Sequence, residues 1–250
     1  MRLTVDVGNS RVSVALARAG AVDAWQGVPA TDGGALTRAI AMLARRAHGE
    51  VRAAAIASVV PARTAAVARA VRAACGVSPK RFPAEIDGDL VVRPRPATSV
   101  GADRLANALG ALALEERDAV VVDVGTAATV DVVTAAGVFE GGMIAPGPRI
   151  GARALARFTA QLPEVPFEEP TARIGRSTRQ AIAVGLWHGF RGLVRALVEE
   201  ALRERPGARV VVAGGDGERC LRGSGIAYVH VPALTHLGLD RALERAGEPS

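Results

Sequence analysis

The chain has 250 residues, which is enough for one large domain or two small ones. Its net charge is +6, but the basic residues are almost all arginines scattered among Ala, Val and Gly. They form no basic cluster of the kind that binds nucleic acid, so nucleic-acid binding is not indicated. The two cysteines, Cys75 and Cys220, lie far apart and in no CxxC or Cys/His spacing, so neither a disulfide framework nor a structural zinc site is indicated. The opening segment MRLTVDVGNS starts on a strand pattern, and no long uncharged apolar run follows, which predicts a cytoplasmic protein outside the membrane.

The first half of the chain alternates between strand and helix patterns. Apolar periodicity and the positions of Gly and Pro predict strands at 3–6, 11–17, 24–28 and 53–59, and helices at 34–48, 64–75 and 101–116. Between them, residues 82–96 are rich in Pro, Gly and Asp and are typical of a connecting loop or a short strand. This alternation indicates an α/β fold.

The second half opens on the same pattern. Strands are expected at 119–123, 129–134 and 210–213, a turn-rich stretch at 141–147, a loop-rich middle at 162–171, and helices at 178–205 and 239–245. The long helix carries Gly185, Gly189 and Gly192, each of which costs roughly 1 kcal/mol relative to Ala. Their spacing predicts a face where another backbone approaches, either of the other domain or of a second subunit.

The most informative feature is a repeat. The segment 3–16, LTVDVGNSRVSVAL, returns in altered form at 120–133 as VVVDVGTAATVDVV, with 117 residues separating Asp6 from Asp123. That interval is the length of a domain and exceeds the periods of solenoids and propellers. The repeat predicts a duplicated fold with domains at 1–117 and 118–250.

Each copy ends a β-branched strand on an Asp-x-Gly turn, with Gly8 in the first and Gly125 in the second. Glycine lets backbone amides approach a phosphate closely, although a single such turn also fits a simple hairpin. The chain has no P-loop lysine, so Mg²⁺ held by Asp6 or Asp123 would supply positive charge. Two copies and a third glycine turn at Gly214 favour phosphate binding.

The segment Gly101-Ala102-Asp103-Arg104 is the next candidate. At the start of a helix, the Asp103 carboxylate can accept a hydroxyl proton while the Arg104 guanidinium binds a substrate carboxylate or phosphate. The competing interpretation is an acidic residue that stabilises the helix dipole. Thr178 stands where the long helix begins and is either its N-cap or a ligand contact.

Five motifs together resemble those of type III pantothenate kinases. They are DVGNS at Asp6, GADR at Gly101, DVGTA at Asp123, GGMIAPG at Gly141, and RST followed by AIAVG at Arg176. The resemblance spans nearly the whole chain. It implies a fold of the acetate and sugar kinase, Hsp70 and actin superfamily, with two ribonuclease-H-like α/β domains and a nucleotide cleft between them. It also implies phosphorylation of the primary hydroxyl of pantothenate by ATP, the first step toward coenzyme A.

The same resemblance implies roles for individual residues. Asp103 would be the general base, Asp6 and Asp123 would hold Mg²⁺ and a monovalent cation such as K⁺ or NH₄⁺, and the protein would be a homodimer. The residues implied for the first phosphate loop are Asp6, Val7, Gly8, Asn9, Ser10, Arg11, Val12 and Ser13, with Thr126 as a further ATP contact. Those implied for pantothenate are Gly101, Ala102, Asp103, Arg104 and Thr178.

One segment departs from the family pattern. Members usually have a tyrosine and then a proline shortly before GxDR, whereas this chain has Pro94 and Ala97 at those positions, and its one tyrosine is Tyr228. The wall beside pantothenate is therefore expected to be built differently. The alternative function is an accessory or regulatory protein on the same scaffold with weak or no kinase activity. A sugar or acetate kinase is a further alternative, which the GADR and GGMIAPG motifs disfavour.

Overall fold

A computed structural model describes residues 1–248, which form two compact units. Unit 1 contains residues 1–119, 133–141 and 233–248, and unit 2 contains Val120–Val132 and Gly142–Pro232. The first repeat copy lies in unit 1 and most of the second in unit 2. The end of the chain belongs to unit 1, whereas a single cut after residue 117 would place it with the second half; the two-domain boundary stays a prediction.

Unit 1 is built on a five-stranded sheet in the order β3-β2-β1-β4-β5. Its strands are β1 (Arg2–Val7), β2 (Arg11–Arg18), β3 (Ala21–Pro29), β4 (Ala53–Ser58) and β5 (Lys80–Phe82). The first three form an antiparallel meander, and β4 runs parallel to β1 with Asp6 opposite Ala57. The carboxyl ends of β1 and β4 therefore lie at the same edge, where open α/β sheets bind ligands.

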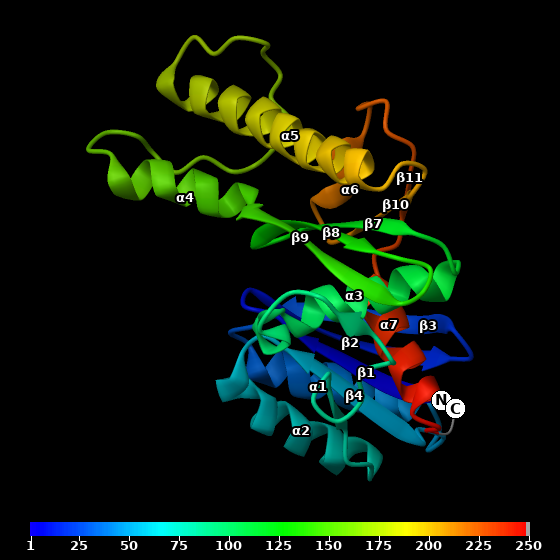
Figure 1. The fold of residues 1–250 in the computed structure, drawn as a ribbon. Helices are drawn as coiled ribbons and strands as arrows, with labels where there is room; N and C mark the ends of the chain where they lie inside the picture. The colour runs from blue at the N-terminus through cyan, green and yellow to red at the C-terminus, as the bar shows by residue number, and fades with distance from the viewer. Residues whose placement is uncertain (249–250) are drawn as a thin grey trace. The chain divides into compact units, whose positions relative to one another are not determined.

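Helices cover both faces of this sheet (Figure 1). On one face lie α1 (Gly33–Arg46) and α2 (Pro61–Cys75), and on the other α3 (Ala102–Leu114) and α7 (Leu234–Arg245). The last two pack backbone to backbone, because a Cβ on Gly238 would come within 1.8 Å of the Ala106 carbonyl oxygen. Glycine is thus required where α3 and α7 cross.

Helix α7 also carries a buried polar seam that faces β1. The Arg2 guanidinium pairs with the Asp240 carboxylate at 3.1 Å, with side-chain exposures of 5% and 0%. One turn earlier on α7, His236 contacts Thr4 on the same face of the strand. The second Asp240 oxygen accepts the backbone N–H of Gly20 at 3.0 Å. These contacts tie the last helix to the first strand.

Unit 2 repeats the strand-and-turn arrangement with different helices. The second sheet has the order β11-β10-β7-β8-β9-β6; its last strand, β6 (Val91–Val92), and the residues of β9 paired with it, Val138 and Phe139, are counted in unit 1. Its other strands are β7 (Ala119–Val124), β8 (Ala127–Val133), β9 (Val138–Pro146), β10 (Arg209–Ala213) and β11 (Tyr228–His230). The helices are α4 (Pro148–Phe158), α5 (Thr178–Glu204) and α6 (Gly217–Leu221). In Figure 1, α5 covers the strands with α4 beside it, and Leu186, Trp187 and Val194 enter the core.

The structure corrects several sequence expectations. The sequence predicts a turn-rich stretch at 141–147, but β9 continues to Pro146, and α4 follows at Pro148–Phe158, where no element was predicted. Helix α7 starts at Leu234 instead of residue 239. The remaining predicted elements agree with the structure to within a few residues, and β6 is the short strand that 82–96 allowed. The short elements β5, β11 and α6 were not predicted.

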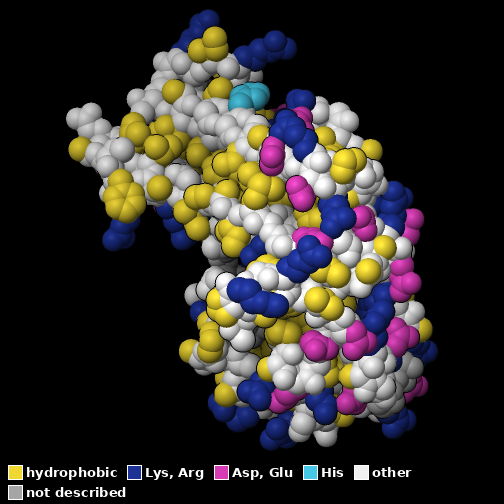
Figure 2. All heavy atoms as spheres, viewed as in Figure 1, with side chains coloured by type: hydrophobic (Ala, Val, Ile, Leu, Met, Phe, Trp, Pro, Cys, Tyr) yellow, Lys and Arg dark blue, Asp and Glu magenta, His cyan; other side chains and the backbone are white. Residues whose placement is uncertain are grey.

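Helix α5 is the one helix within residues 1–248 that is long and apolar enough, by length and composition alone, to cross a membrane. Its buried residues belong to the core of unit 2. On the face shown in Figure 2, Lys and Arg side chains are interspersed with Asp and Glu, and hydrophobic side chains gather over α4 and α5.

Candidate functional site

The first Asp-x-Gly turn joins β1 to β2 at the carboxyl end of β1. Gly8 donates its N–H to the Arg11 carbonyl oxygen at 3.0 Å, and a Cβ on Gly8 would lie 3.0 Å from that oxygen. Asn9 and Ser10 are exposed at the tip, and Asp6 stands opposite Ser13 in the strand register. The turn thus carries short polar side chains at the ligand-binding edge of the sheet.

The predicted loop 6–13 divides into exposed and buried positions. Val7 and Val12 are 0% and 2% exposed, so a ligand could meet them only through their backbone. Arg11 is exposed and extends across β3, where a Cβ on Gly27 would lie 2.8 Å from its Nη2 atom. Glycine at residue 27 therefore leaves the space that the Arg11 guanidinium occupies.

Ser13, at the end of this loop, shares a hydrogen bond with His236 of α7. The two ring nitrogens of His236 lie 2.9 Å from the hydroxyls of Ser13 and Thr4, so the ring bridges β1 and β2. His236 is 2% exposed, and desolvation lowers its pKa to about 4. It is a core histidine with both nitrogens satisfied.

Protein stability is expected to fall below pH 6.5 through His236. An unfolded chain takes up a proton near pH 6.5, whereas the folded ring resists protonation down to about pH 4, so acid favours unfolding in that window. By pH 5 the loss in unfolding free energy should be about 2 kcal/mol. Urea titrations of the wild type and His236→Gln at pH 7 and pH 5 measure it. Equal pH dependence in the two proteins would contradict the assignment.

The GADR segment lies at the same sheet edge as the first turn. Val59, just after β4, donates its N–H to the Val7 carbonyl oxygen at 3.1 Å, and its Cγ1 would lie 3.6 Å from a Cβ on Gly101. That Cβ would also lie 2.5 Å from Asp103 Oδ1, so a side chain at residue 101 would displace the carboxylate from this position. Asp103 is half-buried in the first turn of α3, and its Oδ1 accepts the Arg104 N–H at 2.8 Å.

The side chain of Arg104 stacks on an aromatic ring. Its guanidinium carbon lies 5.6 Å from the centre of the Phe139 ring. In the preceding segment, Pro94 occupies the position of the usual tyrosine, and its Cγ would lie 3.3 Å from a Cβ on Gly141. Arg93 pairs with Glu140 at 2.8 Å. The segment before GADR is thus held against β9 by a proline, a salt bridge and the β6 pairing.

In unit 2, the backbone of Gly147, the residue that follows β9, packs against the second Asp-x-Gly turn. Gly147 donates its N–H to the Thr126 carbonyl oxygen at 3.0 Å, and a Cβ there would lie 2.2 Å from the Gly125 carbonyl oxygen. The third glycine turn approaches from β10, where a Cβ on Gly214 would lie 2.2 Å from Asp123 Oδ1. Glycines thus bring three chain segments together around Asp123 and Thr126.

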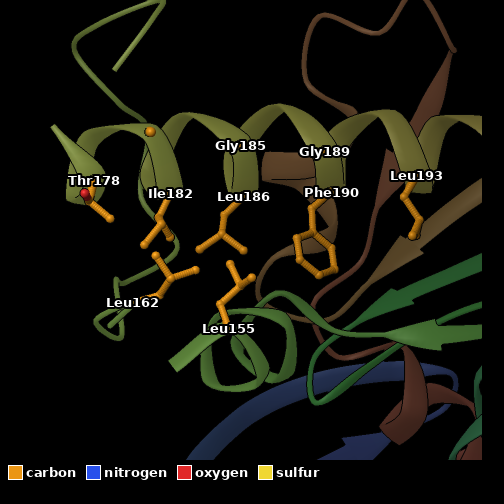
Figure 3. Close-up of a pocket in the computed structure, with 10 residues that line it drawn as sticks. Leu155, Leu162, Thr178, Ile182, Gly185, Leu186, Gly189, Phe190 and Leu193 are labelled. Atoms are coloured by element: carbon orange, nitrogen blue, oxygen red, sulfur yellow. The ribbon is translucent and has the colours of Figure 1, made fainter. Parts of the chain in front are cut away.

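Thr178 belongs to a different feature, an apolar cavity of about 430 Å³ between α4 and α5. Figure 3 shows Leu155 and Leu162 facing Leu186 and Ile182 of α5, with Thr178 at one end. Thr178 is not the N-cap: Ser177 caps α5, and its Oγ accepts the Gln180 N–H at 3.3 Å. Its exposed hydroxyl leaves the ligand interpretation open.

Within residues 1–248, no group of three or more His, Cys, Asp or Glu side chains is close enough to hold a metal ion. A cation at Asp6 or Asp123 would therefore need oxygen ligands from the backbone, water or the substrate, which suits Mg²⁺ and K⁺ better than zinc. Sequence reasoning did not single out Arg149 or Asp216, which lie beside the unit 2 turns. Asp216 directly follows the Gly214-Gly215 pair, which was a usable signal.

Comparison with known proteins gives a consistent result. The profile of the type III pantothenate kinase family matches residues 2–200. A type III pantothenate kinase of Acidothermus cellulolyticus is 36% identical, with 98% of each chain covered. Among solved structures, a Baf family transcriptional activator from Campylobacter jejuni aligns over 98% of both chains with a TM-score of 0.60 at 16% identity.

A second solved structure extends the likeness in fold. A 2-dehydro-3-deoxygalactonokinase protein from Sinorhizobium meliloti aligns over 100% of both chains with a TM-score of 0.57 and 15% identity. At such identities these structures bear on the fold alone. They confirm the predicted α/β architecture of the sugar kinase and actin type.

Proposed function

This chain belongs to the type III pantothenate kinase family, which phosphorylates pantothenate with ATP on the way to coenzyme A, and we propose that Asp103 is its general base. The observation that carries the proposal is the position of Asp103 at the carboxyl edge of the first sheet, in the first turn of α3. This is the edge that bears the first Asp-x-Gly turn. A half-buried carboxylate there can accept the proton of the pantothenate hydroxyl as its oxygen attacks the γ-phosphorus and ADP leaves.

The first turn is assigned to the phosphates of ATP. Its tight backbone and the exposed Asn9 and Ser10 support contacts to phosphate oxygens, and Val7 and Val12 contribute through the backbone alone. Asp6, at the end of β1, is assigned to Mg²⁺, directly or through water. Bound Mg²⁺ would neutralise charge on the transferred phosphoryl group.

The second turn is assigned to the nucleotide and a monovalent cation. Gly214 leaves beside Asp123 Oδ1 a space that a Cβ would fill, which supports a cation such as K⁺ or NH₄⁺ at this carboxylate. Thr126 is assigned to ATP, since its turn is fixed by the Gly147 contact. A cation there would add positive charge to a turn whose own sequence, GTAA, has none.

Pantothenate is assigned to Gly101, Ala102 and Arg104, with Thr178 as a further contact. The planar guanidinium of Arg104 suits the carboxylate of pantothenate, and stacking on Phe139 orients its plane. Pro94 stands where relatives usually have a tyrosine, so this wall offers no phenol hydroxyl to the substrate.

The active protein is further proposed to be a cytoplasmic homodimer. A Cβ built on Gly185, Gly189 or Gly192 of α5 meets no atom within 4 Å, so this glycine face is open in the single chain. The apolar cavity that Gly185 and Gly189 line lies on the same helix. Both features support close approach of a second copy.

The decisive experiment is coupled ADP release with purified protein, ATP, Mg²⁺ and pantothenate. Turnover should depend on pantothenate and should rise and saturate with potassium when sodium keeps the ionic strength constant. Asp123→Asn should weaken the potassium response, whereas Asp118→Asn, a change outside the turn, should keep it. Absence of pantothenate-dependent ADP release would refute the function, and equal rates in sodium and potassium would refute the monovalent cation.

A further inference from the structure

A buried carboxylate in unit 2 is paired with two arginines. The Asp216 side chain is 5% exposed, and it lies 3.1 Å from Nη1 of Arg219 and 3.3 Å from Nη2 of Arg149. Each oxygen takes one partner, Oδ1 the first arginine and Oδ2 the second. One carboxylate faces two guanidinium groups, so these three side chains carry one surplus positive charge.

The two arginines have different environments. Arg219 donates a hydrogen bond to the Phe167 carbonyl oxygen at 3.2 Å and stacks on the Phe167 and Trp187 rings at 5.3 and 5.4 Å. It is part of the packing and is sufficient to neutralise Asp216. Arg149 is 64% exposed, and Asp216 is its only hydrogen-bond or ion-pair partner among the described residues.

An arginine with one partner keeps most of its capacity for anions. A guanidinium has five N–H donors in a planar fork, which matches the oxygens of a phosphate. Arg149 uses one nitrogen for Asp216. As a salt bridge alone, so exposed a side chain would add little stability.

The position of Arg149 points to the nucleotide. It lies two residues after Gly147, whose backbone packs on Gly125 and Thr126 of the second Asp-x-Gly turn. Its partner Asp216 follows the third glycine turn and donates its N–H to the Val124 carbonyl oxygen at 3.2 Å. The Arg149–Asp216 pair thus links the second Asp-x-Gly turn, which is assigned to the nucleotide, to the glycine turn at Gly214.

We propose that Arg149 binds a phosphate group of ATP and that Asp216 is the positioning residue that holds its guanidinium beside the turns. The inference rests on the proposed function, since it takes ATP as the ligand. This chain has no P-loop lysine, and Arg149 of α4 would supply the positively charged side chain that contacts the phosphates. Lys80, the one lysine, pairs with Glu248 in unit 1.

The test compares Arg149→Ala and Arg149→Lys with the matched control Arg153→Ala. Arg153 lies one turn later on α4, is 73% exposed and pairs with Glu164 at 3.6 Å. Calorimetric titration with a non-hydrolysable ATP analogue and with adenosine separates phosphate contacts from base and ribose contacts. Thermal melts of all variants establish that they fold.

Arg149→Ala should bind the ATP analogue about 10- to 100-fold more weakly, as expected for losing hydrogen bonds to a charged group. Adenosine binding and the KM for pantothenate should stay unchanged, the KM for ATP should rise, and Arg149→Lys should recover part of the loss. Arg153→Ala should match the wild type throughout.

Unchanged binding of the analogue by Arg149→Ala would overturn the proposal. Equal losses for the analogue and for adenosine would also overturn it, because they would show an effect on the shape of the site and not on phosphate. If the wild type bound the analogue but released no ADP with pantothenate, the proposed function would fail while the Arg149 comparison would still decide its own question.

Discussion

Replacing Asp103 with asparagine is expected to lower kcat by about 10²- to 10⁴-fold, the usual contribution of a general base. Asparagine keeps an oxygen that can accept the Arg104 N–H, now bonded to Oδ1 at 2.8 Å, so the start of α3 should be preserved. What disappears is the ability to take a proton from the pantothenate hydroxyl. ATP binding, measured by calorimetry, and the thermal midpoint should stay near those of the wild type.

The matched control for this change is Asp32→Asn. Asp32 also stands at a helix start, where its Oδ1 caps α1 by accepting the Ala35 N–H at 2.7 Å. Asparagine caps helices about as well, so both stability and kcat should be unaffected. Full activity in Asp103→Asn would remove this residue from the base role. A loss of ATP binding equal to the loss of kcat would assign it to nucleotide binding instead.

Replacing Asp240 with asparagine is expected to reduce the free energy of unfolding by about 3–5 kcal/mol. The change leaves the Arg2 guanidinium, whose side chain is 5% exposed, without its negative partner in a site closed to water. Asp240 uses one oxygen for Arg2 and the other for the Gly20 N–H, so the single amide oxygen of asparagine can replace at most one of these acceptors and none of the negative charge. Urea denaturation at pH 7 measures the difference.

Two variants isolate the cause of that loss. Glu244→Gln neutralises an exposed carboxylate on the same helix and should change the unfolding free energy by less than about 0.5 kcal/mol. The double change Arg2→Met with Asp240→Leu removes both charges and should regain much of the lost stability, because no buried charge remains unpaired. If Asp240→Asn were as stable as Glu244→Gln, the buried pair would not hold α7 to β1.

Sequence patterns predicted the strands of both repeat copies because β-branched runs end on Asp-x-Gly in each. They suggested a turn at the end of β9, where glycines cluster, and they gave no helix at the residues of α4. The reasons lie in packing that no local pattern shows. A Cβ on Gly151 would come within 2.8 Å of the Phe190 ring, and one on Gly142 within 2.2 Å of the Val130 carbonyl oxygen. These glycines sit inside regular elements because a neighbour comes close.

In the candidate site, too, some residues could be predicted from local sequence motifs and others could not. The turns and the GADR segment are contiguous in sequence, so motifs indicated them, and Asp103 does lie at the sheet edge of the first turn. The Arg149–Asp216 pair joins residues far apart in the chain, and the His236 contacts to Thr4 and Ser13 span the whole of it. Only tertiary structure brings such residues together.

The seam between α7 and β1 has a consequence for how the protein is made. Thr4 and His236 are 232 residues apart, so at ribosomal rates of about 5–20 residues per second the first strand waits roughly 10–50 s for its partner. Until then the strands that carry the first turn have one face uncovered. A nascent chain halted before α7 would therefore lack the His236 contact to Ser13. The turn in the N-terminal half thus reaches its final structure only when translation is almost complete.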